Sequence, residues 1–123
     1  TALLFLGVII LSTLGLEQEG EADEDSAALT GTALIMAQAD GFEEVHEIVL
    51  GRCSMCHARE PFWDGIRTAP KAVLLETEAD LARQAKAVFL HAGMTDAMPP
   101  ANVTFMEPEG RAAIRRWFTK AGM

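Results

Sequence analysis

The sequence contains few residues that could hold a metal ion on their own. Its 123 residues include two cysteines and three histidines. A structural zinc site usually takes four Cys or His ligands arranged in closely spaced pairs. Cys53 and Cys56 form one such pair, and no second Cys/His pair at ligand spacing occurs elsewhere. This shortage argues against a structural zinc site.

Basic residues are also scarce. Lys and Arg total 10 against 18 Asp and Glu, which gives a formal net charge of −8, and no Lys or Arg precedes Arg52. A nucleic-acid-binding protein needs a basic patch or stripe for the phosphate backbone. The acidic balance therefore excludes nucleic acid as a partner. A convincing strand pattern is missing as well, which favours an all-α protein.

Against this background one short motif stands out, Cys53-Ser54-Met55-Cys56-His57. Two thiols at this CxxCH spacing can each add across a vinyl group of one haem, and the following histidine then lies beneath the iron as proximal ligand. Apolar residues recur at three- and four-residue steps between positions 42 and 49, which predicts a helix before the motif. A thioredoxin-like redox disulfide would instead follow a strand. The motif predicts one covalent haem c, with a redox disulfide or a metal site as the alternatives.

A c-type haem used for electron transfer commonly has methionine as its second axial ligand, because a soft thioether raises the potential. Met98 is followed by Pro99 and Pro100, which fix φ and hold the preceding residue on a stiff extended loop. We therefore expect His57 and Met98 to bind the iron. Met94 is the second choice.

His46 and His91 are rival ligands, and either would give a bis-histidine iron of lower potential. His46 lies in the helix that leads into the motif, on the wrong side of the attachment point. His91 precedes Gly93, which is expected at the C′ position of a helix, where an imidazole suits the helix dipole. Both histidines are interpreted as structural.

The chain before the motif divides into three stretches. Residues 2–16 are apolar but shorter than a full membrane span, and we interpret them as the end of a transmembrane helix of a longer protein, with a buried core helix as the alternative. The acidic residues 17–25 predict a solvated linker on the non-cytoplasmic side. Residues 27–39 are a linker or a short docking segment. The expected division is therefore 1–16 membrane helix, 17–39 linker and 40–123 globular domain.

Three helices are expected in the globular domain. Thr77 with Asp80 at N3 caps the second helix, while a proline at N1 starts the third and Gly122 follows its end. Packing of the first helix across the last beside a haem resembles class I cytochrome c. The predicted helices are Phe42–Leu50, Glu78–Leu90 and Pro108–Lys120.

The resemblance to small c-type cytochromes implies roles for residues after the motif. Pro70 resembles the proline whose carbonyl accepts a hydrogen bond from the free ring nitrogen of the proximal histidine, although it could equally form a plain turn. Trp63, Arg59 and Arg67 lie where indole or guanidinium donors commonly hold a haem propionate. An exposed basic loop is the alternative for these three residues.

Longer motifs narrow the resemblance. The runs Trp63-Asp64-Gly65 and Ala97-Met98-Pro99-Pro100-Ala101-Asn102-Val103-Thr104, together with CxxCH, are similar to the C-terminal cytochrome of the membrane-bound bacterial urate hydroxylases. This similarity spans roughly residues 42–121. It implies a cytochrome on the periplasmic side of the bacterial inner membrane that accepts electrons from an upstream membrane domain that oxidises urate. A soluble cytochrome or terminal oxidase would be the acceptor.

Two other functions compete with this one. The first is a free-standing, membrane-anchored periplasmic cytochrome that donates electrons to a terminal oxidase. The second is a haem sensor or peroxidase, which needs an open sixth position and is disfavoured by the Met-Pro-Pro loop. In each of the electron-transfer readings this chain carries no catalytic residue of its own.

Overall fold

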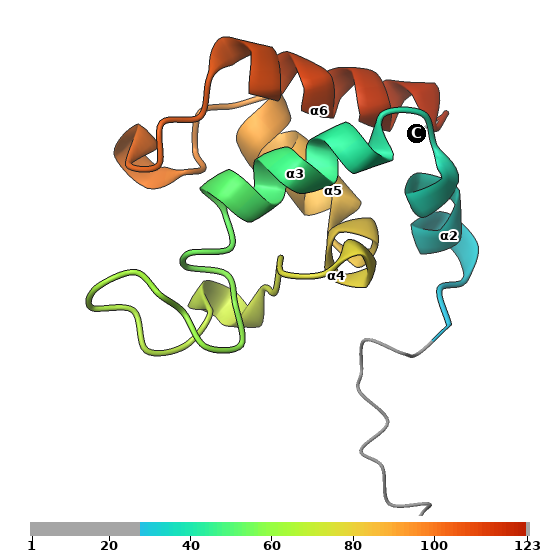
Figure 1. Ribbon diagram of the computed structural model, residues 1–123. Helices are drawn as coiled ribbons and strands as arrows, with labels where there is room; N and C mark the ends of the chain where they lie inside the picture. The colour runs from blue at the N-terminus through green and yellow to red at the C-terminus, as the bar shows by residue number, and fades with distance from the viewer. Residues whose placement is uncertain (1–27, 123) are drawn as a thin grey trace, which may run out of the picture.

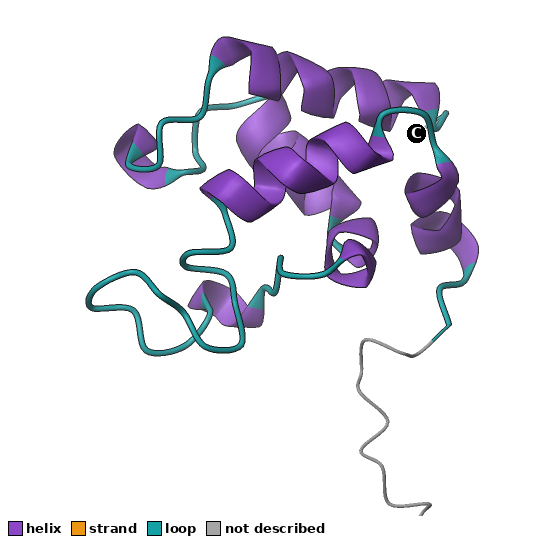
Figure 2. Cartoon of the chain, in the orientation of Figure 1, coloured by secondary structure: helices purple, strands orange, loops and turns teal. Residues whose placement is uncertain are grey.

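The computed structural model describes residues 28–122, and every regular element in that range is helical (Figures 1 and 2). The all-α class is thereby confirmed. The expected membrane helix and the acidic linker 17–25 lie outside the described residues, and no helix within 28–122 is long and apolar enough to cross a membrane. The elements in chain order are α2 (Gly31–Gln38), α3 (Phe42–Arg52), η2 (Pro70–Ala72), α4 (Glu78–Arg83), α5 (Ala85–Val88), η3 (Phe89–Gly93), η4 (Pro100–Asn102) and α6 (Pro108–Lys120).

Helices α3 and α6 pack against each other, with α6 running along the top of the molecule in Figure 1 and α3 directly beneath it. Gly41 precedes α3 with φ of 92°, a left-handed conformation that favours glycine, and a Cβ there would lie 3.7 Å from Trp117 Cβ. The turn brings the Phe42 ring against Trp117, with ring centroids 6.0 Å apart. The apolar faces of both helices meet in the core, as their spacing predicts.

The second predicted helix is present but broken. Its start is confirmed, because Thr77 and Asp80 form the expected capping box. The helix then ends at Arg83 and restarts as α5, since Gln84 has φ −100° and ψ 12°, and the chain finishes in a π-helical turn, η3. The predicted helix Glu78–Leu90 therefore starts where expected, but the prediction that it continues unbroken to Leu90 is wrong.

Gly93 does not have the C′ role expected from the sequence. It is the last residue of η3, and its φ lies outside the left-handed region. A Cβ at this position would lie 3.0 Å from Ile114 Cγ2. A larger residue here would push against Ile114, because η3 and α6 approach closely, and this tertiary contact is not visible in the local sequence.

The stretch before Asp40 joins the packed fold. Residues 31–38 form α2, which packs on α4 and α3. The Met36 side chain is fully buried, and its carbonyl accepts a 3.0 Å hydrogen bond from Trp117 Nε1. Of the two readings of 27–39, the structure therefore favours the docking segment, and the packed unit begins before residue 40.

Candidate haem-binding site

The CxxCH motif forms a tight turn at the end of α3. Cys53 N–H donates to Val49 O at 2.8 Å and so extends the last helical turn, while His57 N–H returns to Cys53 O at 3.0 Å. The Cys53 side chain is buried in the core, whereas Cys56 and His57 are half-buried. Neither thiol is in a disulfide. Helix α3 thus fixes the position of the first thiol, and the turn presents the other two groups.

The electrostatics of the thiols do not resemble those of a redox pair. Burial raises the pKa of Cys53 to about 11, with the nearby Cys56 adding to the rise and Arg111 opposing it. Burial also raises the pKa of Cys56. Cysteines that exchange disulfides have lowered pKa values, because the thiolate is the nucleophile. These directions argue against the redox-disulfide alternative.

The His57 ring is oriented by a backbone carbonyl. His57 Nδ1 lies 2.9 Å from Val73 O, and since a carbonyl only accepts, Nδ1 must carry the proton. Nε2 is then the nitrogen with a lone pair for a metal. The backbone supports the same pairing, because Leu75 N–H donates to His57 O at 2.7 Å.

Of the two roles predicted for Pro70, the structure supports the plain turn and not the hydrogen bond to His57. Pro70 O accepts from Val73 N–H at 3.1 Å, so it closes the short η2 turn instead of facing the imidazole. That turn delivers Val73 O to His57. Pro70 therefore acts one step away, by starting the turn that positions the carbonyl.

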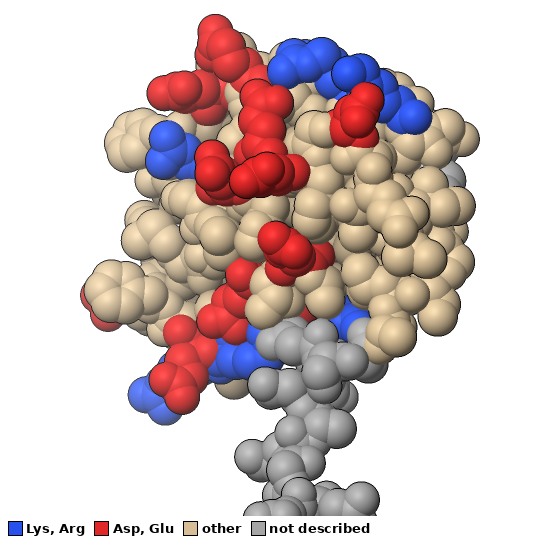
Figure 3. Space-filling model, turned by 45° about the vertical axis from the view of Figure 1, so that its right-hand side comes forward, with Lys and Arg blue, Asp and Glu red and all other residues tan. Residues whose placement is uncertain are grey.

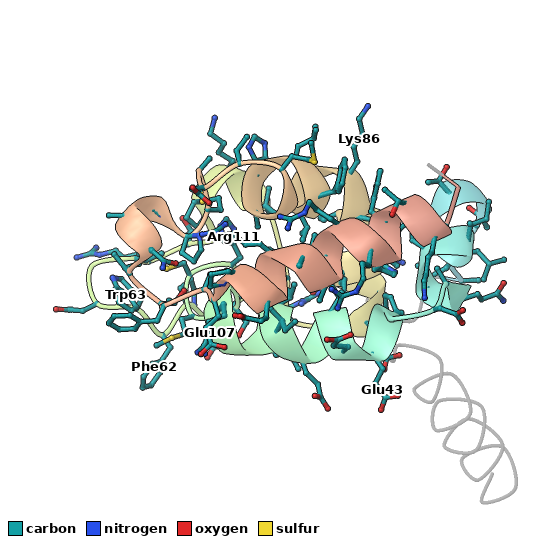
Figure 4. The ribbon with its side chains drawn as sticks, turned by 90° about the horizontal axis from the view of Figure 1, so that it is seen from above. Glu43, Phe62, Trp63, Lys86, Glu107 and Arg111 are labelled. Carbon is teal, nitrogen blue, oxygen red and sulfur yellow. The ribbon has the colours of Figure 1, made fainter. Side chains whose placement is uncertain are left out.

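Residues 94–106 form a second loop, here called the methionine loop; residues 53–76 are called the attachment loop. Both lie at the same end of the molecule in the two ribbon views (Figures 1 and 4). Met98 is half-buried and packs against the core cluster that includes Cys53, whereas Met94 is 58 % exposed. The burial supports Met98 over Met94 as the sixth ligand, which stays a prediction.

Arg111 holds the methionine loop and was missed in the sequence. Its Nη1 donates to the carbonyls of Ala92 at 2.9 Å, Thr95 at 3.3 Å and Met98 at 2.9 Å, and the side chain is buried. Its Nε lies 3.2 Å from Asp96 Oδ1. A signal was available, because Arg111 falls three residues before Ile114 on the apolar face of α6, where a cation needs partners.

The far end of the methionine loop is fastened to α3. Thr104 Oγ1 donates to Arg52 O at 2.7 Å, directly before Cys53. Asn102 exchanges two hydrogen bonds with the Met106 backbone, accepting from N–H at 2.8 Å and donating to the carbonyl at 3.2 Å. These bonds place the methionine loop beside the start of the attachment loop.

Arg59, one of the three residues expected at a haem propionate, is instead paired with carboxylates of the protein. Its guanidinium bridges Glu76 at 2.8 Å and Asp80 at 3.1 Å. Burial alone would raise the pKa of Asp80, but the hydrogen bonds from Arg59 and from the Thr77 and Glu76 N–H groups outweigh it and lower that pKa. Arg59 therefore ties the attachment loop to the cap of α4, and its use for a propionate is disfavoured.

Trp63 and Arg67 lie further along the attachment loop. The backbone N–H of Trp63 donates to Met55 O at 2.9 Å, which brings residue 63 next to the CxxCH turn. Its side chain is half-buried, and Figure 4 shows it at the end of the molecule where the attachment loop lies. Arg67 is exposed. A propionate contact from either residue stays a prediction.

The two other histidines are on helical elements. His46 lies on α3 and stacks on Phe42 with ring centroids 6.1 Å apart, and its Nε2 is buried without a hydrogen-bond partner. His91 is exposed in η3, and its carbonyl accepts from Met98 N–H at 2.9 Å. Their interpretation as structural is compatible with these positions.

The donor set fits a haem better than a bare metal ion. It comprises two unpaired thiols at CxxCH spacing, an imidazole with Nε2 available and a half-buried thioether. Within residues 28–122 no group of three or more His, Cys, Asp or Glu side chains could hold a metal ion.

The acidic charge of the domain is unevenly distributed. Glu44, Glu47, Glu107 and Glu109 line a hollow between α3 and the start of α6. In Figure 3 acidic side chains are most crowded at the upper left and continue through the centre toward the lower left, and basic groups lie along the top right and at the lower edge.

Compared with known proteins, the chain matches no protein-family model, no curated protein and no solved structure.

Proposed function

We propose that the folded unit is a single-haem c-type cytochrome domain whose function is electron transfer. The observation that carries the proposal is His57, which directly follows the two motif cysteines and has Nδ1 bound to Val73 O, so that Nε2 is available as a ligand. A bound haem would supply reversible one-electron chemistry.

The residues of the chain would divide the work of holding this group. Cys53 and Cys56 would provide the covalent attachment, and His57 and Met98 the two axial ligands. The Val73 carbonyl fixes the plane and the tautomer of the imidazole. Burial of Cys53 and half-burial of Met98 against the same core limit access of water to this region.

The sequence resemblance extends the proposal to a parent protein. In this extension the domain is the electron-accepting C-terminal part of a membrane urate hydroxylase, located on the periplasmic side of the bacterial inner membrane. The upstream domain would oxidise urate to 5-hydroxyisourate, and this domain would pass the electrons singly to a soluble cytochrome or terminal oxidase. The alternative is a free-standing, membrane-anchored cytochrome that donates to a terminal oxidase.

Haem retention tests the core of the proposal. After production with a c-type maturation system, acid–acetone extraction should leave the haem on the polypeptide, because thioether bonds survive denaturation. The double variant Cys53→Ala/Cys56→Ala should release it. Haem passing into the solvent from the wild-type protein would refute the proposal.

The axial ligands are tested by spectroscopy. Ferric haem with a thioether ligand has a weak near-infrared band, which Met98→Leu should abolish. Met94→Leu is the matched control and should leave the band intact, since Met94 is exposed. The reverse pattern would assign the ligand to Met94.

The parent protein is tested separately. Reduction of the haem by urate only when the upstream membrane region is present would support the urate hydroxylase reading. An upstream coding sequence with a start codon and a short basic leader would favour the free-standing cytochrome. Urate consumption by the isolated domain would contradict both.

A further inference from the structure

Three side chains in one short segment could act as the sixth ligand: His91, Met94 and Met98. In the structure His91 and Met94 are exposed, while Met98 is half-buried against the core. The intrinsic chemistry of the two methionines is the same. Something in the fold must therefore decide which of them faces inward.

The contacts of Arg111 occur along this same segment. The carbonyls of Ala92, Thr95 and Met98 all accept from one nitrogen, Nη1, at 2.9, 3.3 and 2.9 Å. Three carbonyls that converge on one point force the chain between them into a closed turn. Because Met98 O is one of the three, the backbone at Met98 is held as well, and with it the direction in which its Cα–Cβ bond leaves the chain.

The location of Arg111 makes these contacts strong. Its side chain is buried, and hydrogen bonds from a charged donor are stronger than neutral ones. A buried cation without acceptors would be costly, so the turn is the low-energy arrangement for both the arginine and the carbonyls. The exposed Asp96 adds its carboxylate at Nε.

We propose that Arg111 is a positioning residue that selects Met98 over Met94 and His91 as the sixth ligand. This inference rests on the proposed function. The hydrogen bonds of Arg111 go to backbone carbonyls, so it acts through the backbone of residues 92–98. Without it, the methionine loop would open more often, and Met98 would leave the iron more readily.

The experiment measures how easily Met98 is displaced. Imidazole added to the ferric holoprotein can bind only where Met98 has left, so its apparent affinity reports the population of the open loop. Arg111→Gln should bind imidazole roughly tenfold more tightly than wild type, as expected for losing charge-assisted hydrogen bonds. Its near-infrared band should weaken, and Arg111→Lys, which keeps the charge, should recover part of both effects.

Arg115 provides a matched control. It is one turn further along α6, and its Nη1 donates to Gly93 O at 2.8 Å, so it touches the same segment without reaching Met98. Arg115→Gln should keep the full band and an imidazole affinity within about twofold of wild type. Equal behaviour of the Arg111→Gln and Arg115→Gln variants would overturn the proposal.

The remaining outcomes are also decisive. If Arg111→Gln does not fold, Arg111→Met, which keeps an unbranched side chain but has no donor, carries the test once its circular dichroism spectrum shows the correct helix content. Wild-type imidazole affinity in that variant together with an undiminished band would overturn the selection role. Absence of haem from the wild-type protein would defeat the proposed function instead. A band that survives Met98→Leu would defeat the ligand assignment, so the three failures are distinguishable.

Discussion

The helical frame and the two loops that carry the candidate ligands are held in different ways. In α3, α5 and α6 the contacts are between many buried apolar side chains. The attachment loop and the methionine loop are held by a few polar side chains that bind backbone or carboxylate groups, namely Arg59, Thr104, Asn102 and Arg111. The frame thus has redundant contacts, whereas each loop depends on single residues.

Substitutions in the two regions should therefore have different effects on the protein. Loss of one apolar side chain from the frame lowers the stability of the whole domain, because the core is shared by all the helices. Loss of one polar anchor should release one loop and leave the frame folded. The predictions below compare the two regions, beginning with the largest effect.

Trp117→Ala should have the largest effect, because Trp117 is 1 % exposed and contacts both Phe42 and the Met36 carbonyl. We expect a loss of about 3–5 kcal/mol in the free energy of unfolding, measured by urea denaturation of the holoprotein. Trp117→Phe retains most of the volume and isolates the hydrogen bond to α2. A cost under about 1 kcal/mol for the alanine variant would mean that the frame is not one shared core.

Asp80→Asn tests the anchor of the attachment loop. It removes the charge that accepts from Arg59 and from two backbone N–H groups, and should cost about 1–2 kcal/mol at neutral pH. Because the folded state lowers the pKa of Asp80, its contribution is present above the unfolded pKa, about 3.9, and is lost as the pH falls through the lower folded value. The difference between wild type and variant should therefore shrink below about pH 4.

Glu78→Gln is the control for this pH dependence. Glu78 is in the same first turn of α4 but is exposed. Its replacement should change the unfolding free energy by at most about 0.5 kcal/mol at any pH between 3 and 7. A pH profile for Asp80→Asn that parallels this control would show that the ion pair with Arg59 contributes nothing to stability.

The frame was largely predictable from the sequence, because its signals are local. The starts of α3, α4 and α6 follow from apolar periodicity, a capping box and a proline at N1, and all three are confirmed. The close packing of Gly93 on α6 was not predictable, since it depends on Ile114, which lies 21 residues away in sequence. The break at Gln84 has no local signal in the sequence.

In the candidate site, too, the residues with a local sequence signal were predictable and those that depend on tertiary contacts were not. The motif residues Cys53, Cys56 and His57 are contiguous, so spacing alone identifies them. The sequence left two roles open for Pro70, a carbonyl for His57 or a plain turn. The carbonyl that faces the ring is that of Val73, because the geometry of the η2 turn decides which carbonyl points there. Arg111 was missed because its three carbonyl partners lie 13 to 19 residues away in sequence.

The smallest expected effect compares one substitution in both regions, Ala→Gly. Ala112 lies inside α6, where glycine should cost about 0.5–1 kcal/mol in backbone entropy. Ala101 lies in the methionine loop with φ of 51°, a left-handed conformation that costs a non-glycine residue roughly 1–2 kcal/mol. At Ala101 glycine relieves this strain while also loosening the unfolded chain by about 0.4–1 kcal/mol, so Ala101→Gly should be neutral or stabilising by up to about 1 kcal/mol. Paired urea denaturation curves on the holoprotein measure the difference, and an equal loss of stability at both positions would remove the left-handed strain assigned to the methionine loop.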